Sequence, residues 1–247
     1  MPNRVFAESL SQDCIRITDA EAHHLLNVLR LKAGDEIEIF DGCGQSARGI
    51  IEATSRKHAD VTITARHTAD HCVDGVELTV AAAPPKGDRL KWMVEKLTEL
   101  GVHQLILTQT ERSVVNPGDS KQEKLKANVI AACKQCGRNR LMTISSPVEL
   151  SAAIENAMSQ QQQLLVAHPG DKIKSAGLRP TVGVSDPTSK NVTLFIGPEG
   201  GFTDSEIQQL LDAGANTISW PSTILRIETA ALALAAVVMF LANGTEK

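Results

Sequence analysis

The stretch Phe195-Ile-Gly-Pro-Glu-Gly-Gly-Phe-Thr-Asp-Ser-Glu206 decides the fold of this chain. An apolar run that ends at Ile196 leads directly into a turn with three glycines, one proline and one carboxylate. Thr203 and Glu206 then fit a capping box, which opens a helix running to about Leu211. A strand that enters a helix through such a turn is typical of α/β domains, where ligands bind beyond the carboxyl ends of the strands.

On both sides of this turn, apolar strands alternate with helical patterns. We expect strands at 76–83, 104–108, 164–168, 192–196 and 217–220, and helices at 87–100, 121–136, 148–159, 203–211 and 228–241. Gly101 is placed to end the expected helix at 87–100. Between the expected strands at 164–168 and 192–196, we expect residues 169–191 to form a long loop or an insertion. The pattern predicts an α/β domain with a mostly parallel sheet.

The first 70 residues have a different pattern. Short runs with a period of two stand at 35–40, 48–53 and 60–65, with glycine-rich turns between them and one helix at about 19–30. This alternation predicts a small antiparallel barrel or sheet. We therefore expect two domains, 1–72 and 73–247, with the boundary in the polar stretch near Asp70 to Gly75.

Composition limits the class of protein. The 247 residues are 42% hydrophobic and 22% charged, which is ordinary for a globular protein. The first residues lack the apolar stretch of a signal peptide, and the longest apolar run, 230–242, is shorter than the roughly 20 residues that span a bilayer. An odd number of cysteines, five, favours a reducing compartment. We expect a cytoplasmic protein without a membrane segment.

Charge is unevenly distributed along the chain. The net charge is −4, yet the segment from Lys86 to Arg140 holds eleven basic and six acidic residues, a balance of +5 against −9 elsewhere. Such a segment could contact phosphates, or it could form solvated helix faces, and charge alone favours the second interpretation.

Four segments carry candidate chemistry. The Gly197 to Gly201 turn matches neither the dinucleotide fingerprint nor the phosphate loop, so it is either a ligand-binding turn or a tight connection. Arg226 and Glu228 precede an Ala-rich helix that could serve as a subunit interface or an ordinary buried helix. The turn from Pro84 to Lys91 is basic and opens a helix, where phosphate groups are attracted.

The fourth segment is Cys133-Lys-Gln-Cys-Gly-Arg-Asn-Arg140. Its two cysteines lack a second pair or a histidine at zinc-ligand spacing, so we expect no metal site. The arginines after the helix are better candidates for RNA contact. His23 and His24 are expected to be structural or RNA-facing.

Taken in order, several segments resemble the RsmE-type family of 16S ribosomal RNA uridine-N3 methyltransferases, of the SPOUT class. The matching pieces are His23-His-Leu-Leu-Asn-Val-Leu-Arg-Leu-Lys-Ala-Gly-Asp-Glu36, Phe40-Asp-Gly, Pro85-Lys-Gly-Asp-Arg89, Glu95-Lys-Leu-Thr-Glu-Leu-Gly-Val102, Arg112-Ser, Gln135-Cys-Gly-Arg138, Ile196-Gly-Pro-Glu-Gly-Gly-Phe202 and Leu225-Arg-Ile-Glu-Thr-Ala230. Each is weak alone, but the ordered set spans nearly the whole chain.

The resemblance implies a fold, a cofactor and partners. It implies a PUA-like RNA-binding β-barrel before an α/β domain with a deep trefoil knot, S-adenosyl-L-methionine as the cofactor, and a homodimer acting on 16S rRNA of the small ribosomal subunit. The implied cofactor contacts are His168, Gly197, Pro198, Glu199, Gly200, Gly201, Ile218, Trp220, Leu225, Arg226 and Thr229. The expected RNA contacts are Arg4, His24, Arg30, Lys86, Arg89, Arg112, Arg138 and Arg140.

For catalysis, the N3 of uracil must lose a proton, and Glu199 or Glu228 is the expected base. Arg226 could stabilise the resulting anion. The chain departs from the family pattern in three places: Lys134 stands where a glutamate is expected, Pro221 at a glycine position, and Thr223 at an arginine position.

These departures leave other readings open. One is an RNA-binding protein that kept the fold and lost activity. Another is an enzyme of the same class acting on a different RNA or at a ribose 2′-oxygen, and a third is a small-molecule α/β enzyme with an accessory barrel.

Overall fold

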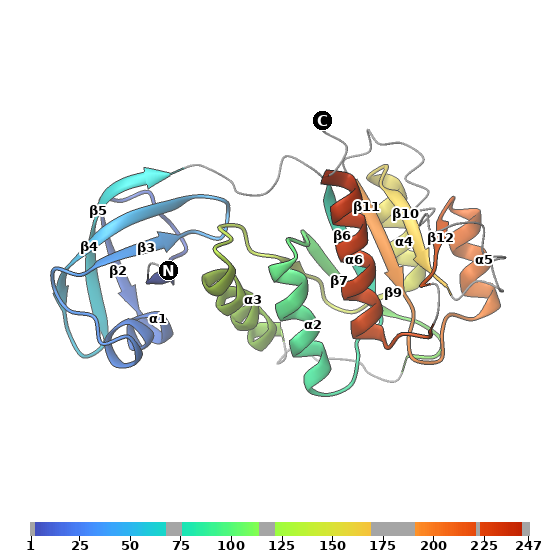
Figure 1. Cartoon of the computed structure of the whole chain (residues 1–247), viewed down its shortest axis with the longest axis horizontal. Helices are drawn as coiled ribbons and strands as arrows, with labels where there is room; N and C mark the ends of the chain where they lie inside the picture. Colours follow the sequence, from blue (N-terminus) through green and yellow to red (C-terminus); the bar gives the residue numbers. More distant parts are fainter. Residues whose placement is uncertain (1–2, 68–75, 114–121, 169–190, 221–222, 244–247) are drawn as a thin grey trace. The chain divides into compact units, whose positions relative to one another are not determined.

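The computed structural model describes residues 3–67, 76–113, 122–168, 191–220 and 223–243. It consists of two compact units: Met1–Cys72 with Ile130–Leu141, and Val73–Val129 with Met142–Lys247. Each unit contains its own β-sheet (Figure 1). Across the described ranges, no helix is long and apolar enough to cross a membrane.

The first unit is built on a five-stranded sheet. Its strands, in order across the sheet, are β1 (Arg4–Phe6), β3 (Glu36–Phe40), β4 (Ser46–Thr54), β5 (His58–His67) and β2 (Cys14–Thr18). All neighbours are antiparallel except β1 and β3. The three alternating runs are thus confirmed as strands. β1 and β2 end the strand order, so the sheet is a curled half-barrel rather than a closed barrel (Figure 1).

The predicted helix at 19–30 is shorter and less regular than the pattern indicated. An α-helix, α1 (Asp19–His23), continues as one π-helical segment, η1 (His24–Val28). The chain then leaves the helix at Arg30, whose φ of 57° lies in the left-handed region. Leu25 from this segment is fully buried in the apolar core of the unit.

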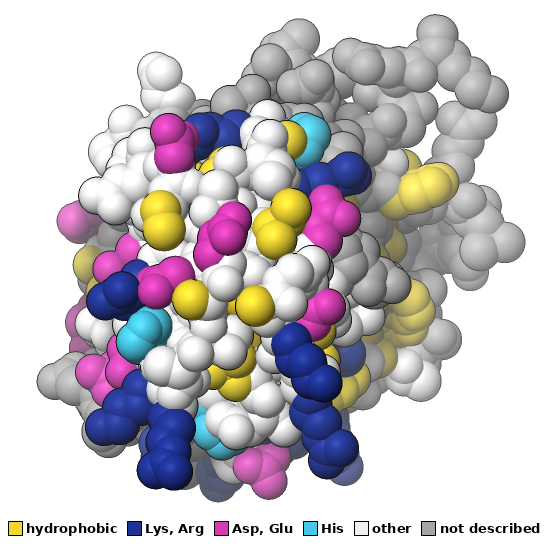
Figure 2. Space-filling view, turned by 90° about the vertical axis from the view of Figure 1, so that its left-hand side faces the viewer, with side chains coloured by type: hydrophobic (Ala, Val, Ile, Leu, Met, Phe, Trp, Pro, Cys, Tyr) yellow, Lys and Arg dark blue, Asp and Glu magenta, His cyan; other side chains and the backbone are white. Residues whose placement is uncertain are grey.

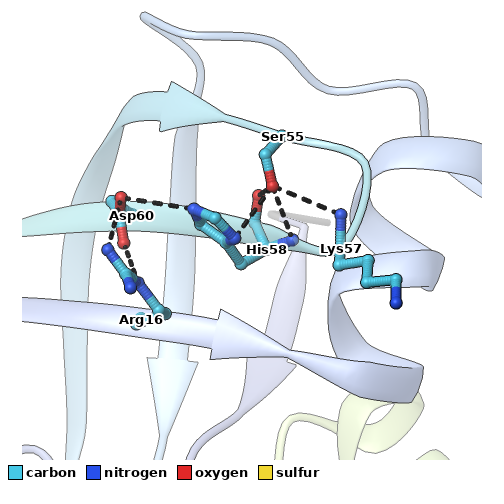
Figure 3. A network of polar contacts seen from close by, with 5 residues as sticks. All are labelled: Arg16, Ser55, Lys57, His58 and Asp60. Carbon is cyan, nitrogen blue, oxygen red and sulfur yellow. Dashed lines mark hydrogen bonds and ion pairs between the residues drawn. The ribbon is translucent and has the colours of Figure 1, made fainter.

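A network of polar contacts lies on β2, β5 and the turn before β5, at the edge of this sheet that β2 forms (Figure 3). Arg16 on β2 pairs in register with Asp60 on β5, and its Nε donates a hydrogen bond of 2.7 Å to Oδ1. This hydrogen bond holds the pKa of Asp60 below its ordinary value of 3.8. Ser55 Oγ lies 2.8 Å from His58 Nδ1 and closes the turn between β4 and β5.

The second unit is a parallel α/β sheet, as predicted. Its strands, in order across the sheet, are β12 (Asn216–Ile218), β10 (Gln163–Ala167), β11 (Asn191–Ile196), β6 (Glu77–Ala82), β7 (Gln104–Gln109) and β8 (Thr143–Ile144), with β9 (Val148–Glu149) also on β7. Every pair is parallel. The helix expected at 148–159 begins two residues later, because Val148–Glu149 pairs with β7.

Helices cover this sheet. α6 (Ile227–Asn243) contacts β6, β11 and α2 (Asp88–Glu99). α4 (Leu150–Ser159) and α5 (Asp204–Asp212) bury one face, in a core that includes Phe195. Figure 1 shows α6 and α4 on opposite sides of the sheet. α2 ends where predicted, since Gly101 has a φ of 89°.

One further helix, α3 (Gln122–Cys136), begins in the second unit and ends in the first. The long connection expected at 169–191 lies almost entirely outside the described residues, as does the Pro221 position.

Candidate functional site at the carboxyl edge of the parallel sheet

The turn from Gly197 to Gly201 leaves β11 at the carboxyl edge of the sheet. The Gly201 amide donates a 2.8 Å hydrogen bond to the Pro198 carbonyl, which closes the turn. Gly201 has a φ of 70°, a conformation that favours glycine. At Gly197, an added Cβ would lie 3.0 Å from the Phe202 ring and 3.1 Å from its amide nitrogen. The sequence therefore folds into a tight turn with its backbone close to the surface.

Two side chains anchor this turn to the segment after β7. Arg112 Nη1 donates a hydrogen bond of 2.8 Å to the carbonyl of Gly200. The buried Glu206 carboxylate accepts two backbone hydrogen bonds of 2.8 Å, from Glu111 through Oε1 and from Thr203 through Oε2. The predicted capping box is confirmed, and its Glu206 also ties a second loop in place.

The ends of three parallel strands meet at this edge. Ala167 is in register with Ile196 on one side and with Ile218 on the other. The His168 amide donates to the Ile218 carbonyl at 3.1 Å. The strand register thus brings together His168, the start of the Gly197 turn and Ile218, which the family resemblance implies as contacts of one cofactor.

The remaining predicted cofactor residues differ in exposure. Pro198 and Ile218 are buried, and Leu225 is half-buried. Trp220 is 42% exposed, and Thr229 is exposed. An exposed indole next to a ligand-binding edge is available to contact a partner or a ligand.

The two candidate carboxylates are joined by one arginine. Arg89 Nη2 donates a hydrogen bond of 3.3 Å to Glu199 Oε1, and Arg89 Nη1 lies 3.6 Å from Glu228 Oε2. The second contact is an ion pair but too long for a hydrogen bond, and Glu228 Oε2 accepts none from the described residues. Glu228 is buried, whereas the side chain of Glu199 is 42% exposed.

Arg226 stands just before α6. Its carbonyl accepts a 2.8 Å hydrogen bond from the Ala230 amide, which starts the helix. Its side chain is exposed and has no ion pair or hydrogen bond with the described part of the chain. The guanidinium is thus available to a ligand.

The other predicted RNA contacts lie in both units. Arg30 and Lys86 are exposed, and His24, Arg138 and Arg140 are half-buried. Lys and Arg side chains gather along the lower margins of the face in Figure 2.

Arg4, another predicted RNA contact, is held by contacts within the first unit. Its side chain is only 5% exposed, donates to the Cys133 carbonyl at 3.1 Å and hydrogen-bonds Asn139. It also lies 3.5 Å from Glu38 and 4.9 Å from the Phe40 ring centroid. These contacts join β1 to the segment 130–141 and support a structural role.

The unexpected Lys134 has a partner. Its Nζ lies 2.8 Å from Glu21 Oε1, and Glu21 Oε2 accepts from the Phe6 amide at 3.1 Å. Both side chains are mostly buried. The Glu21 carboxylate therefore compensates the positive charge of Lys134, the residue that stands where the family pattern has a glutamate.

The two cysteines of the Cys-x-x-Cys segment differ in environment. Cys133 is buried and Cys136 is exposed. Among the described residues, no group of three or more His, Cys, Asp or Glu side chains could hold a metal ion.

Sequence reasoning missed four contacts: those of Arg89 with Glu199 and with Glu228, that of Arg112 with the glycine turn, and that of Glu206 with Glu111. Arg89, Arg112 and Glu206 were each visible in a motif. Their partners were not, because 88 to 139 residues separate them in the chain.

Comparison with known proteins agrees with this architecture. Residues 74–239 match the RNA methyltransferase domain model, and residues 17–64 match the RNA methyltransferase PUA domain model. The ribosomal RNA small subunit methyltransferase E of Bacillus subtilis is 28% identical over 220 residues, covering 87% of this chain and 86% of its own. That of Rickettsia conorii is 29% identical and covers 99% and 98%.

Solved structures give the same result. Ribosomal RNA small subunit methyltransferase E from Neisseria gonorrhoeae, bound to S-adenosylmethionine, superposes with a TM-score of 0.85 at 26% identity over 100% of both chains. A Legionella pneumophila methyltransferase in complex with the same cofactor gives 0.84 at 27% identity over 98% of both. The model match covers most of the chain, and the chain therefore belongs to the RNA methyltransferase domain family, with a PUA domain preceding its α/β domain.

Proposed function

We propose that this protein transfers a methyl group from S-adenosylmethionine to N3 of a uridine in the 16S rRNA of the small ribosomal subunit. The observation that carries the proposal is the Gly197 to Gly201 turn at the edge of the parallel sheet, with Glu199 within it joined through Arg89 to Glu228. The names and bound cofactor of the relatives support the same reaction.

The residues at this edge fit the cofactor. Gly200 and Gly201 present backbone without side chains, and only the Arg112 side chain approaches the position of a Cβ at Gly200. Ile218 and Leu225 offer apolar contact for an adenine ring, and backbone amides and carbonyls offer its hydrogen bonds. His168, Gly197 to Gly201, Ile218, Trp220, Leu225, Arg226 and Thr229 would hold the group. When bound, it supplies an electrophilic methyl group on a sulfonium sulfur.

The protein's own residues act on the base. Glu199 or Glu228 accepts the N3 proton, so that the nitrogen lone pair becomes nucleophilic; such a base contributes roughly 10²–10⁴-fold. Arg226 donates hydrogen bonds to a uracil oxygen and stabilises the negative charge that develops there. Orientation of the base contributes a comparable or larger share, since positioning is worth on the order of 7–11 kcal/mol.

The partner assignments follow the resemblance. Residues 1–72 would form the PUA-like RNA-binding domain and 73–247 the SPOUT methyltransferase domain with its trefoil knot. Lys86 and Arg112, together with Arg30 and with Arg138 and Arg140 of the segment 130–141 that belongs to the first compact unit, would contact phosphates. We also propose a homodimer acting in the cytoplasm, where its ribosomal substrate lies.

The test is methyl transfer from labelled S-adenosylmethionine to unmodified small subunits, followed by nucleoside mass spectrometry. We expect 3-methyluridine. A 2′-O-methylated nucleoside, or no product despite cofactor binding, would contradict this assignment and indicate another target. If calorimetry detects no cofactor binding, the chain is an inactive RNA-binding relative.

A further inference from the structure

We propose that Arg89 is a positioning residue that holds Glu199 in place as the base for the N3 proton, while the buried Glu228 holds Arg89. This inference rests on the proposed function and assigns different roles to the two candidate carboxylates. It also gives Arg89 a role other than the phosphate contact that its basic segment indicated.

The difference in exposure separates the two carboxylates. Glu228 is 8% exposed at its side chain, so a uracil ring has little access to its oxygens. Glu199 is 42% exposed and lies in the glycine turn, where a substrate can approach. A general base must come within hydrogen-bond reach of the proton it removes, and only Glu199 meets that condition without rearrangement.

The contacts of Arg89 explain how the two roles are linked. One guanidinium nitrogen pairs with buried Glu228 at 3.6 Å, another donates to Glu199 at 3.3 Å, and Nε donates to the Lys86 carbonyl at 3.3 Å. The planar guanidinium fixes these directions relative to one another. Burying Glu228 without a cation would be unfavourable, so the pair also fixes Arg89.

The proton balance is simple. The N3–H bond breaks, and the proton passes to a Glu199 oxygen. The electron pair left on N3 forms the new bond to the methyl carbon, while the carbon–sulfur bond of the sulfonium breaks and its electron pair passes to sulfur. That proton leaves to water after the reaction, which returns Glu199 to its ionised form beside Arg89. Glu228 takes no part in this proton transfer.

The kinetic test compares Arg89→Ala, Arg89→Lys, Glu199→Gln and the double variant Arg89→Ala/Glu199→Gln in steady-state methylation of unmodified small subunits. We expect Arg89→Ala to lower kcat about 100-fold, within the range of a general base, with the KM for subunits changed less than about twofold. Arg89→Lys should recover part of kcat. The double variant should be no slower than Glu199→Gln, because Arg89 acts through that carboxylate.

A second measurement does not depend on catalysis. Binding to unmodified subunits is titrated against salt without cofactor, with Lys86→Ala as the matched control from the same turn. Lys86→Ala should reduce the salt slope by about one, as loss of a phosphate contact does, whereas Arg89→Ala should leave it unchanged. An equal reduction in Arg89→Ala, with a raised KM and unchanged kcat, would overturn the proposal in favour of a phosphate contact.

The remaining outcomes are separable. Multiplicative losses in the double variant would show that Arg89 and Glu199 act independently and would overturn the proposal. If Arg89→Ala unfolds, the double variant Arg89→Ala/Glu228→Gln should restore its melting temperature, and kcat is then read in that background. If the wild-type protein makes no 3-methyluridine, the proposed function fails; if it does and Arg89→Ala retains full kcat, only this inference fails.

Discussion

Arg112 Nη1 donates a 2.8 Å hydrogen bond to the carbonyl of Gly200, so a residue that is also proposed to contact RNA supports the glycine turn. The same nitrogen lies 3.5 Å from the Phe202 carbonyl. The Arg112 side chain thus contacts the carbonyls of Gly200 and Phe202, in the part of the turn that leads into α5. The glycine turn is thus supported by a residue that lies 88 positions away in sequence.

We expect Arg112→Ala to weaken S-adenosylmethionine binding about threefold to tenfold, because a hydrogen bond from a charged donor to the turn is lost. Isothermal calorimetry of the protein without RNA measures it. Lys86→Ala, which removes another exposed cation of the same unit, should leave cofactor affinity unchanged. If Arg112→Ala binds the cofactor as tightly as the wild type but binds subunits more weakly, Arg112 contributes to RNA binding and not to cofactor binding.

Gly201 and Gly214 form a matched pair for testing the turn. Both have positive φ, 70° and 87°, and neither has an atom within 4 Å of an added Cβ. Substitution by alanine should therefore destabilise both by about 1 kcal/mol through backbone strain alone. Only Gly201→Ala should also weaken cofactor binding, since Gly214 follows the far end of α5. Urea unfolding and calorimetry separate the two effects, and equal cofactor affinities in both variants would exclude backbone approach at Gly201.

Glu206 should be a stability determinant of the α/β unit. Glu206→Ala leaves the amides of Glu111 and Thr203 without their acceptor and removes half of a capping box, which predicts a loss of about 1–3 kcal/mol in the free energy of unfolding. Urea denaturation measures it. Gln209→Ala, on an exposed position of the same helix, is the control and should change stability by less than about 0.5 kcal/mol. A similar change in both variants would show that the Glu111 contact contributes nothing.

Local patterns predicted most elements of both sheets, because period and capping are properties of neighbouring residues. The run before Ile196 and the Thr203 to Glu206 box required no long-range information. Val148–Glu149 was assigned to a helix because its strand character comes from pairing with β7, not from its own sequence.

The site was predicted in outline, and its internal contacts were not. Glycines at a strand end indicate where a ligand binds, since that position follows from topology. The choice between solvent, phosphate and a carboxylate as the partner of Arg89 depends on how β6, β11 and α6 pack. Arg4 shows the same limit, because its burial comes from contact with Cys133 and Asn139, more than a hundred residues away.

The Lys134–Glu21 pair predicts how the first unit tolerates charge changes. Lys134→Glu, which restores the residue expected from the family pattern, would place two carboxylates together in a mostly buried position. We expect a loss of about 1–3 kcal/mol in the free energy of unfolding, and recovery of much of it in Lys134→Glu/Glu21→Lys. Chemical denaturation of the three proteins gives the coupling. If Lys134→Glu is as stable as the wild type, the ion pair does not compensate the departure.

The Arg16–Asp60 pair predicts a pH dependence of the PUA-like unit. Because the pKa of Asp60 is lowered in the folded protein, chiefly by the hydrogen bond from Arg16, ionised Asp60 stabilises the fold at pH values above its unfolded pKa. That contribution is lost as the pH falls through the lowered folded pKa. In Arg16→Gln, the Asp60 pKa should rise towards 3.8, and the extra stability of the wild type above that pH should disappear. NMR titration of the Asp60 carboxyl carbon reports the pKa directly, and denaturation as a function of pH reports the stability.

Arg66→Gln is the control, since Arg66 pairs with Asp13 on the same unit and leaves Asp60 untouched. An Asp60 titration that is identical in wild type and Arg16→Gln would mean that the cross-strand hydrogen bond does not persist in solution, because no other group lowers this pKa as strongly.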